Sequence, residues 1–127
     1  MKDVKNLQIG NWVNARGKDV PVQITSISND GSIEVNDEYY CDVLDLSSIW
    51  LNGITLSKNF EEVHDEWRVA ENLRIGINHG CGKNWALYKT TEEVGYPLQF
   101  VPVCAFNFVH ELQNALPVFG VETEIKL

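Results

Sequence analysis

Apolar and polar residues alternate along the first third of the chain. Val20, Val22 and Ile24 place apolar side chains on one side of an extended segment, while Gln23 lies on the other side. This period of two is typical of a strand with one buried face. Short runs of Asn, Asp and Gly separate the alternating segments, and these residues tolerate the positive φ that tight turns require. The pattern therefore predicts an antiparallel β-meander over residues 1–45. The expected strands cover residues 7–13, 20–25, 32–35 and 38–44.

The middle of the chain, residues 46–104, is ambiguous, because apolar residues in part of it fit both the helical period and the strand period. Phe60, Val63 and Trp67 have the spacing of one helical face. The second half of the same stretch also alternates between polar and apolar side chains, as a strand does. Period alone does not resolve so short a run, so residues 60–70 are either helix or strand.

The clearest helix is predicted at residues 105–117. Polar side chains recur there at positions i, i+3, i+4 and i+7, and apolar side chains fill the rest of the helix surface. Pro117 ends the helix, because its ring disfavours helical geometry at the preceding residue. Residues 121–127 alternate again and are predicted to add an edge strand. These elements predict a single α+β domain over residues 1–127. It is mostly an antiparallel β-meander, as an SH3-like small barrel or a curled sheet, with one C-terminal helix packed on it.

Charge narrows the classes of partner. The 127 residues include 18 acidic and 10 basic side chains, which gives a formal net charge of −8. No Lys or Arg occurs between Lys18 and Lys58, although acidic residues are frequent there. Such a surface repels phosphate groups, so nucleic-acid binding is disfavoured. A solvated acidic face is the favoured interpretation, ahead of a site for a basic partner.

Three features of the sequence bear on cellular location. No run approaches ~20 consecutive apolar residues, so no membrane span is expected. The charged N-terminus has no apolar run behind it, unlike a secretory signal. The three cysteines are far apart and odd in number, which does not suit a disulfide framework. A cytoplasmic protein is expected.

Cys81 is the one weak candidate for a reactive thiol. It lies between two glycines, close to His79 and Lys83, and a nearby cation lowers the pKa of a thiol. A nucleophile also needs a positioned base and an oxyanion hole, and the sequence indicates neither. The favoured interpretation is a hairpin loop with an incidental thiol.

No metal or cofactor is expected. Zinc ligands usually come in closely spaced pairs, and the chain has no CxxC or HxxxH. Its Gly-rich segment lacks the GxxxxGK[ST] pattern of a phosphate loop. No catalytic, cofactor-binding or metal-binding residue is therefore assigned.

A polar stripe on the predicted C-terminal helix is the other candidate site. It consists of His110, Glu111, Gln113 and Asn114. Two interpretations compete. In the favoured one, these side chains satisfy backbone groups of the fold, because a buried polar side chain must find partners. In the other, the stripe binds a partner protein.

Both ends of the chain resemble one protein family. Residues 7–13 read Leu-Gln-Ile-Gly-Asn-Trp-Val, and residues 108–114 read Phe-Val-His-Glu-Leu-Gln-Asn. These motifs are similar to the N-terminal IGNWV and C-terminal (Y/F)VHxLQN signatures of a family of small uncharacterised gut-bacterial proteins, many from prophages or other mobile elements. The resemblance covers about half of the chain. It implies a bacterial or phage protein and supplies no reaction, ligand or site.

The function expected from these observations is a non-enzymatic protein-interaction or structural module of a bacterial mobile element or prophage. Its protein partner is unknown. The first alternative is a nucleic-acid-associated small-barrel protein, because small barrels often bind DNA or RNA. The second alternative is a thiol or metal-dependent enzyme that uses Cys81.

Overall fold

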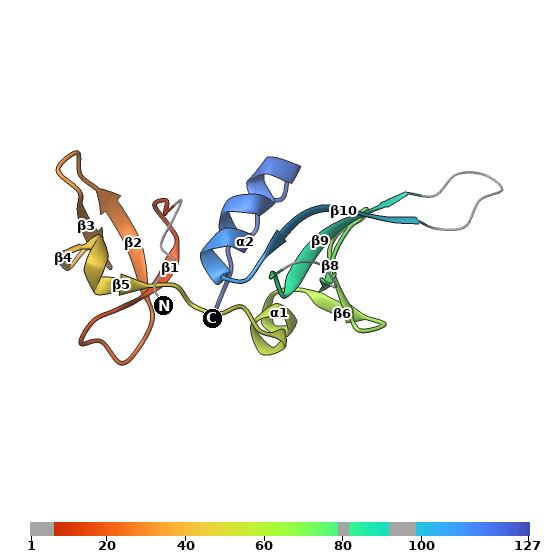
Figure 1. The fold of residues 1–127 in the computed structure, drawn as a ribbon, viewed down its shortest axis with the longest axis horizontal. Helices are drawn as coiled ribbons and strands as arrows, with labels where there is room; N and C mark the ends of the chain where they lie inside the picture. Colours follow the sequence, from red (N-terminus) through yellow and green to blue (C-terminus); the bar gives the residue numbers. More distant parts are fainter. Residues whose placement is uncertain (1–6, 79–81, 92–98) are drawn as a thin grey trace. The chain divides into compact units, whose positions relative to one another are not determined.

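The computed structural model describes residues 7–78, 82–91 and 99–127 (Figure 1). The chain forms two compact units. Unit 1 comprises Met1–Trp50 with Phe108–Asn114, and unit 2 comprises Leu51–Asn107 with Ala115–Leu127. Each unit is built around an antiparallel five-stranded sheet. The α+β class with mostly antiparallel strands and a C-terminal helix is therefore confirmed.

Unit 1 holds the predicted meander. Its strands are β1 (Trp12–Ala15), β2 (Val22–Ile27), β3 (Ser32–Val35), β4 (Tyr39–Asp42) and β5 (Leu46–Ser47), with the 3-10 helix η1 (Val43–Asp45) between the last two. The strand order is β4-β3-β2-β1-β5. Both outer strands of this sheet are free: within the described part of the chain, no pairing joins β4 to β5 and closes a barrel.

The turn between β3 and β4 explains why the meander folds back tightly. Asn36 and Asp37 have φ angles of 53° and 56°, and Glu38 donates its backbone N–H to the Val35 carbonyl at 3.0 Å. Two successive positive φ angles define a type I′ turn, whose twist matches that of the flanking strands. Asn and Asp adopt this conformation more readily than most residues.

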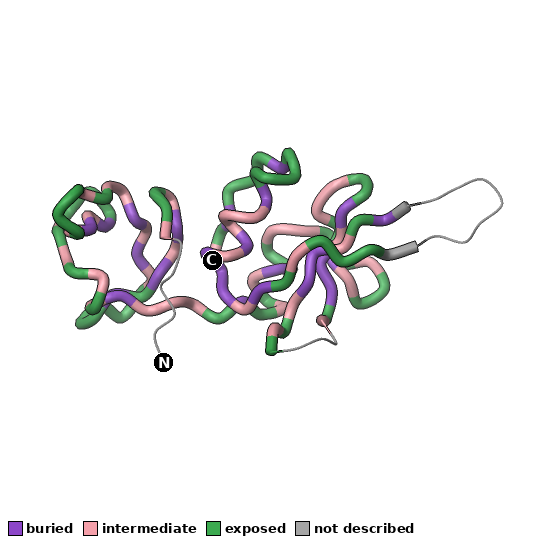
Figure 2. Tube along the Cα trace, turned by 45° about the horizontal axis from the view of Figure 1, so that its top comes forward, coloured by how far each residue is buried: buried purple, intermediate pink, exposed green. Residues whose placement is uncertain are grey.

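Alternation along the strands of unit 1 separates a core from an outer face (Figure 2). The buried cluster consists of Val13, Ala15, Val22, Ile24, Ile33, Val35 and Leu46. Four partly buried side chains pack against it: Leu7, Tyr39, Cys41 and Val43. The period of two seen in the sequence is thus the period with which these strands point into the core.

Unit 2 contains the second sheet and two short helices. Its strands are β6 (Glu61–Val63), β7 (Glu66–Ala70), β8 (Leu73–Ile77), β9 (Trp85–Thr91) and β10 (Gln99–Phe106), in the order β10-β9-β8-β7-β6. Helix α1 (Gly53–Asn59) precedes them, and the 3-10 helix η2 (Leu116–Phe119) follows them. Helix α2 (Val109–Ala115) starts in unit 1, and its last residue belongs to unit 2.

The ambiguous stretch 60–70 is a β-hairpin. His64 and Asp65 have φ angles of 53° and 65°, which again fit a type I′ turn between β6 and β7. Trp67 is buried, and its ring lies edge-on to that of Trp85 at 5.6 Å between centroids. The helical spacing of Phe60, Val63 and Trp67 therefore spans two strands and the turn between them, and only Trp67 lies on β7.

At the C-terminus, the predicted helix is present with other bounds, and the predicted edge strand is absent. The predicted helix 105–117 is shorter, because Phe106 still belongs to β10 and α2 begins only at Val109. Residues 121–127 form no strand. Val121 and Ile125 are nevertheless buried, so the alternation reflects a tail that packs its apolar side chains without joining the sheet.

Candidate functional site

The polar stripe of α2 is largely engaged within unit 1. Gln113 accepts the Trp12 backbone N–H at 2.8 Å and donates to the Gly10 carbonyl at 3.0 Å. The Asn114 Oδ1 accepts a hydrogen bond of 2.8 Å from Asn11 Nδ2. Asn11 is only 2% exposed and also accepts the Gln8 backbone N–H. These side chains fasten α2 to the segment that leads into β1.

The other two stripe residues are also bound within the fold. Glu111 Oε1 accepts the Phe108 backbone N–H at 3.1 Å. His110 is 1% exposed, and its ring stacks parallel to that of Phe108 at 5.9 Å. A side chain so deeply buried is not presented to a substrate or to a partner. The contacts of these four side chains lie within unit 1, and a structural role for the stripe stays a prediction.

The thiols offer no activated nucleophile in the described part of the chain. Cys81 lies outside the described residues. Burial raises the pKa of the Cys41 thiol, with further contributions from Asp45 and Asp42. Burial likewise raises the pKa of Cys104. Among the described residues, no group of three or more His, Cys, Asp or Glu side chains is placed to hold a metal ion.

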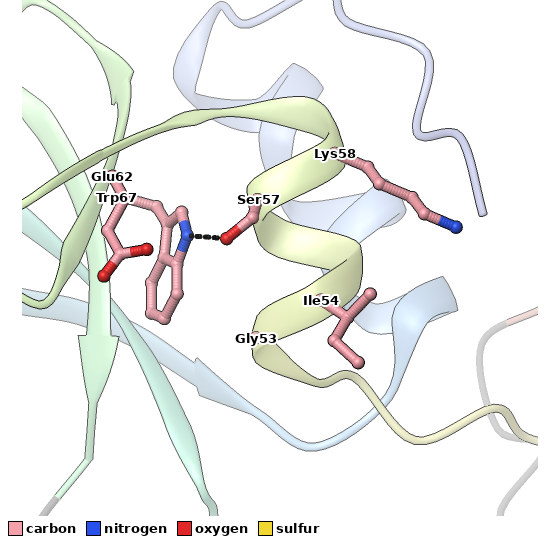
Figure 3. A pocket seen from close by; sticks show the side chains of 6 residues that line it. All are labelled: Gly53, Ile54, Ser57, Lys58, Glu62 and Trp67. Carbon is pink, nitrogen blue, oxygen red and sulfur yellow. Dashed lines mark hydrogen bonds between the residues drawn. The ribbon is translucent and has the colours of Figure 1, made fainter.

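A shallow, open depression of about 600 Å³ lies in unit 2 (Figure 3). Its lining comprises Gly53, Ile54, Ser57, Lys58, Glu62 and Trp67. The Trp67 indole N–H donates to Ser57 Oγ at 3.0 Å, so this hydroxyl serves the packing of α1 on β7. A Cβ at Gly53 would meet the indole at 3.6 Å, which is an ordinary van der Waals distance. Ser57 carries the one hydroxyl of this lining, and its oxygen accepts the indole N–H.

The outer face of β3 and β4 presents a different arrangement. Tyr40 is 61% exposed and is paired in register with Glu34 on β3. Asp42 lies two residues further along β4 and therefore on the same face as Tyr40. The phenol ring is thus exposed with one carboxylate across from it and another beside it.

Both carboxylates are held in place by the fold. Glu34 Oε1 accepts a hydrogen bond from Thr25 Oγ1 at 3.3 Å on β2. Asp42 Oδ1 accepts the Leu44 backbone N–H at 2.9 Å and so caps η1. Each of these bonds uses one oxygen of the carboxylate, which has two acceptor oxygens. A cation near Tyr40 would meet two oriented carboxylates.

The inward side of β4 differs from its outward side. Tyr39 and Cys41 point toward the core but remain only partly buried, because β4 is the outermost strand. Lys18 Nζ lies over the Tyr39 ring at 4.8 Å from its centroid. Partial burial, with the neighbouring Cys41 and Glu38 charges, raises the pKa of the Tyr39 hydroxyl. The phenol therefore remains neutral while a cation lies against its ring.

The sequence alone did not identify this surface. Alternation within residues 38–44 places Tyr40 and Asp42 on one side of a strand. Placing Glu34 beside them requires the register of β3 against β4, which depends on the turn at Asn36 and Asp37. The gap in basic residues is visible in the sequence, whereas the exposure of the Tyr40 ring is seen only in the fold.

Comparisons with protein-family models, with curated proteins and with solved structures find no match for this chain. No helix in the described ranges is long and apolar enough to cross a membrane.

Proposed function

We propose that this protein is a non-enzymatic interaction module that binds an arginine-bearing segment of a protein partner. The observation that carries the proposal is the exposed ring of Tyr40 between Glu34 and Asp42. An arginine guanidinium stacks on an aromatic face and pairs with carboxylates through its planar array of N–H donors. The outer face of β3 and β4 offers both features to one ligand.

Local charge supports the same partner class. The sequence between Lys18 and Lys58 contains no basic residue that would neutralise this face from within its own strands. Unit 1 already holds a cation against an aromatic ring, because Lys18 lies over Tyr39. A partner cation on Tyr40 would repeat this contact on the outer face.

The side-chain contacts alone are modest. A cation–π contact at an exposed site contributes about 0.5–1 kcal/mol. An exposed ion pair contributes about 0–1 kcal/mol and weakens with salt. One arginine on this face would therefore bind weakly, and useful affinity requires several contacts along the partner segment.

The proposal includes the biological setting implied by the terminal motifs, which is a cytoplasmic protein of a bacterial mobile element or prophage. We also propose that the meander is related to SH3-like barrels. Its short, tightly turned strands support this relationship, although no described pairing closes the sheet. Folds of this kind host many functions, so the assignment rests on the surface around Tyr40.

Fluorescence anisotropy with a labelled hexa-arginine peptide tests the proposal. We expect binding that weakens with salt, is weaker for hexalysine and is absent for hexaglutamate. Tyr40→Thr, which keeps a residue suited to strands, should weaken hexa-arginine binding about threefold or more. Asp42→Asn should also weaken it while preserving the cap on η1, because Asn caps as well as Asp.

Glu62→Gln is the matched control. It removes one exposed carboxylate from an outer strand of the other sheet, so it reduces the net negative charge by the same amount as Asp42→Asn. If Glu62→Gln and Asp42→Asn weaken peptide binding equally, binding follows overall charge and the surface around Tyr40 is not the site.

A further inference from the structure

We infer that the partner segment binds as an added β-strand along the free edge of β4. This inference rests on the proposed function and specifies how the arginine-bearing segment is held. β4 is the outermost strand of its sheet, and no described strand pairs with its other side. In an antiparallel sheet, every second residue of such a strand directs its backbone N–H and C=O away from the sheet. Those groups are available to a partner backbone.

The four sheet edges of the protein are not equally open to an added strand. β5 has only two residues and β6 only three, and β6 exposes Glu61 and Glu62. β10 carries Pro102 and an irregular register next to it, two features that block edge pairing. β4 has four residues and contains neither a proline nor a bulge against β3. It is the least protected of these edges.

The side chains of β4 specify what an added strand should look like. Tyr39 and Cys41 pack on the core but remain partly exposed, so an apolar residue beside them would extend the buried layer. Tyr40 and Asp42 point outward, so the alternate residues of the partner would be basic. The fitting ligand is an extended segment in which apolar and basic residues alternate, with arginine favoured over lysine.

The same charges disfavour a second copy of this chain as the occupant. Pairing β4 with β4 of another molecule would bring the Asp42 and Glu34 carboxylates of both copies onto one face. Like charges on neighbouring strands are destabilising. The acidic residues therefore protect this edge from self-association while leaving it open to a basic segment.

Isothermal titration with a seven-residue peptide of alternating arginine and valine tests the inference. A peptide of the same composition with its arginines grouped at one end keeps the charge and loses the alternation. We expect it to bind about tenfold more weakly. A third peptide, N-methylated at every backbone nitrogen, cannot donate hydrogen bonds to an edge. We expect it to lose about tenfold or more in affinity.

The outcomes separate the two proposals. If the N-methylated and unmodified peptides bind equally while Tyr40→Thr weakens both, strand addition is wrong and the arginine-binding function stands. If none of the peptides binds, both are wrong. Concentration-dependent dimerisation through β4, observed by analytical ultracentrifugation, would also overturn the inference.

Amide hydrogen exchange gives a second readout that leaves the fold unaltered. Binding of the alternating peptide should slow exchange at the outward-facing amides of β4 about tenfold or more at saturation. The same amides should be unaffected by the N-methylated peptide. Protection confined to another edge strand would place the peptide elsewhere and contradict the inference.

Discussion

Side-chain amides fix much of this structure at the level of single residues. Gln113 and Asn114 reach from α2 to the chain before β1, and Asn59 holds the C-terminal tail. Each amide has both a donor and an acceptor, so Gln113 and Asn59 each pair with a backbone N–H and a backbone C=O. The sequence indicated that the helix stripe was polar, but not which distant backbone groups it would meet.

The contact between Asn11 and Asn114 should be measurable as a coupling energy. Asn114→Ala leaves the buried Asn11 amide without this acceptor, at a cost of about 1–3 kcal/mol in the free energy of unfolding. Asn11→Ala should cost a similar amount, and the double variant should cost less than the sum of the two. Urea titration followed by circular dichroism measures all four proteins. Strictly additive effects would show that the two amides do not act together.

Cysteine reactivity should follow the burial of each thiol. The raised pKa values of Cys41 and Cys104 reduce the thiolate fraction at neutral pH, and the thiolate is the nucleophile. In a Cys81→Ser background, iodoacetamide should therefore label the native protein more slowly than it labels a free thiol. Labelling should become faster as the pH rises past the ordinary thiol pKa. Equal rates for native and urea-unfolded protein at pH 7 would contradict this expectation.

At the scale of elements, the sequence predicted the strands and turns that depend on residues close together in the chain. The meander of unit 1 follows from alternation and from turn residues that lie next to each other in sequence. β10 was missed because Pro102 and the irregular register beside it interrupt its alternation, yet pairing with β9 holds it in the sheet. The tail 121–127 alternates like a strand, but what holds Lys126 is the Asn59 side chain.

Replacing Asp37, the second residue of the turn at Asn36 and Asp37, with glycine should increase the stability of the protein. Asp37 has a φ of 56°, a conformation that costs a side-chain-bearing residue about 1 kcal/mol and glycine almost nothing. Its backbone N–H bond to Thr25 Oγ1 survives the change. Allowing for the greater flexibility of glycine in the unfolded chain, Asp37→Gly should stabilise the protein by about 0.5 kcal/mol. Asp19→Gly is the control, and a loss of stability on Asp37→Gly would refute the turn assignment.

Two hydrogen bonds between the Asn59 side chain and the Lys126 backbone, called here the tail clamp, should contribute to the stability of unit 2. Asn59 donates to the Lys126 carbonyl at 2.7 Å and accepts the Lys126 backbone N–H at 2.7 Å, next to the buried Ile125. Asn59→Ala removes both bonds, together with the bond from Asn59 Nδ2 to the Thr55 carbonyl in α1, and should destabilise the protein by about 1–2 kcal/mol. Asn52→Ala, which removes the cap of α1, separates loss of the clamp from a general effect on that helix. Amide exchange that accelerates at Lys126 in Asn59→Ala but not in Asn52→Ala would identify the clamp.

At the scale of the whole molecule, charge is the property that the sequence determines most directly. A net charge of −8 follows from counting residues and needs no knowledge of the fold. The fold adds the location of the relevant charges, because it sets Glu34 and Asp42 around an exposed Tyr40. That juxtaposition depends on strand register across a turn. The net charge of the protein was therefore predictable from the sequence, whereas the candidate site was not.

The acidic surface leads to a final expectation about nucleic acids. Association with duplex DNA depends on Lys and Arg that displace counterions from the phosphates, and the stretch between Lys18 and Lys58 has none. We therefore expect no measurable binding of a labelled 20-base-pair duplex at physiological salt, under conditions in which the alternating arginine–valine peptide binds. The duplex and the peptide both carry a high density of charge, but of opposite sign. Comparing them therefore tests whether binding depends on the sign of the charge. If the duplex binds with micromolar affinity that decreases with salt, the protein belongs with the nucleic-acid-associated small barrels, and Tyr40 becomes a candidate platform for stacking bases.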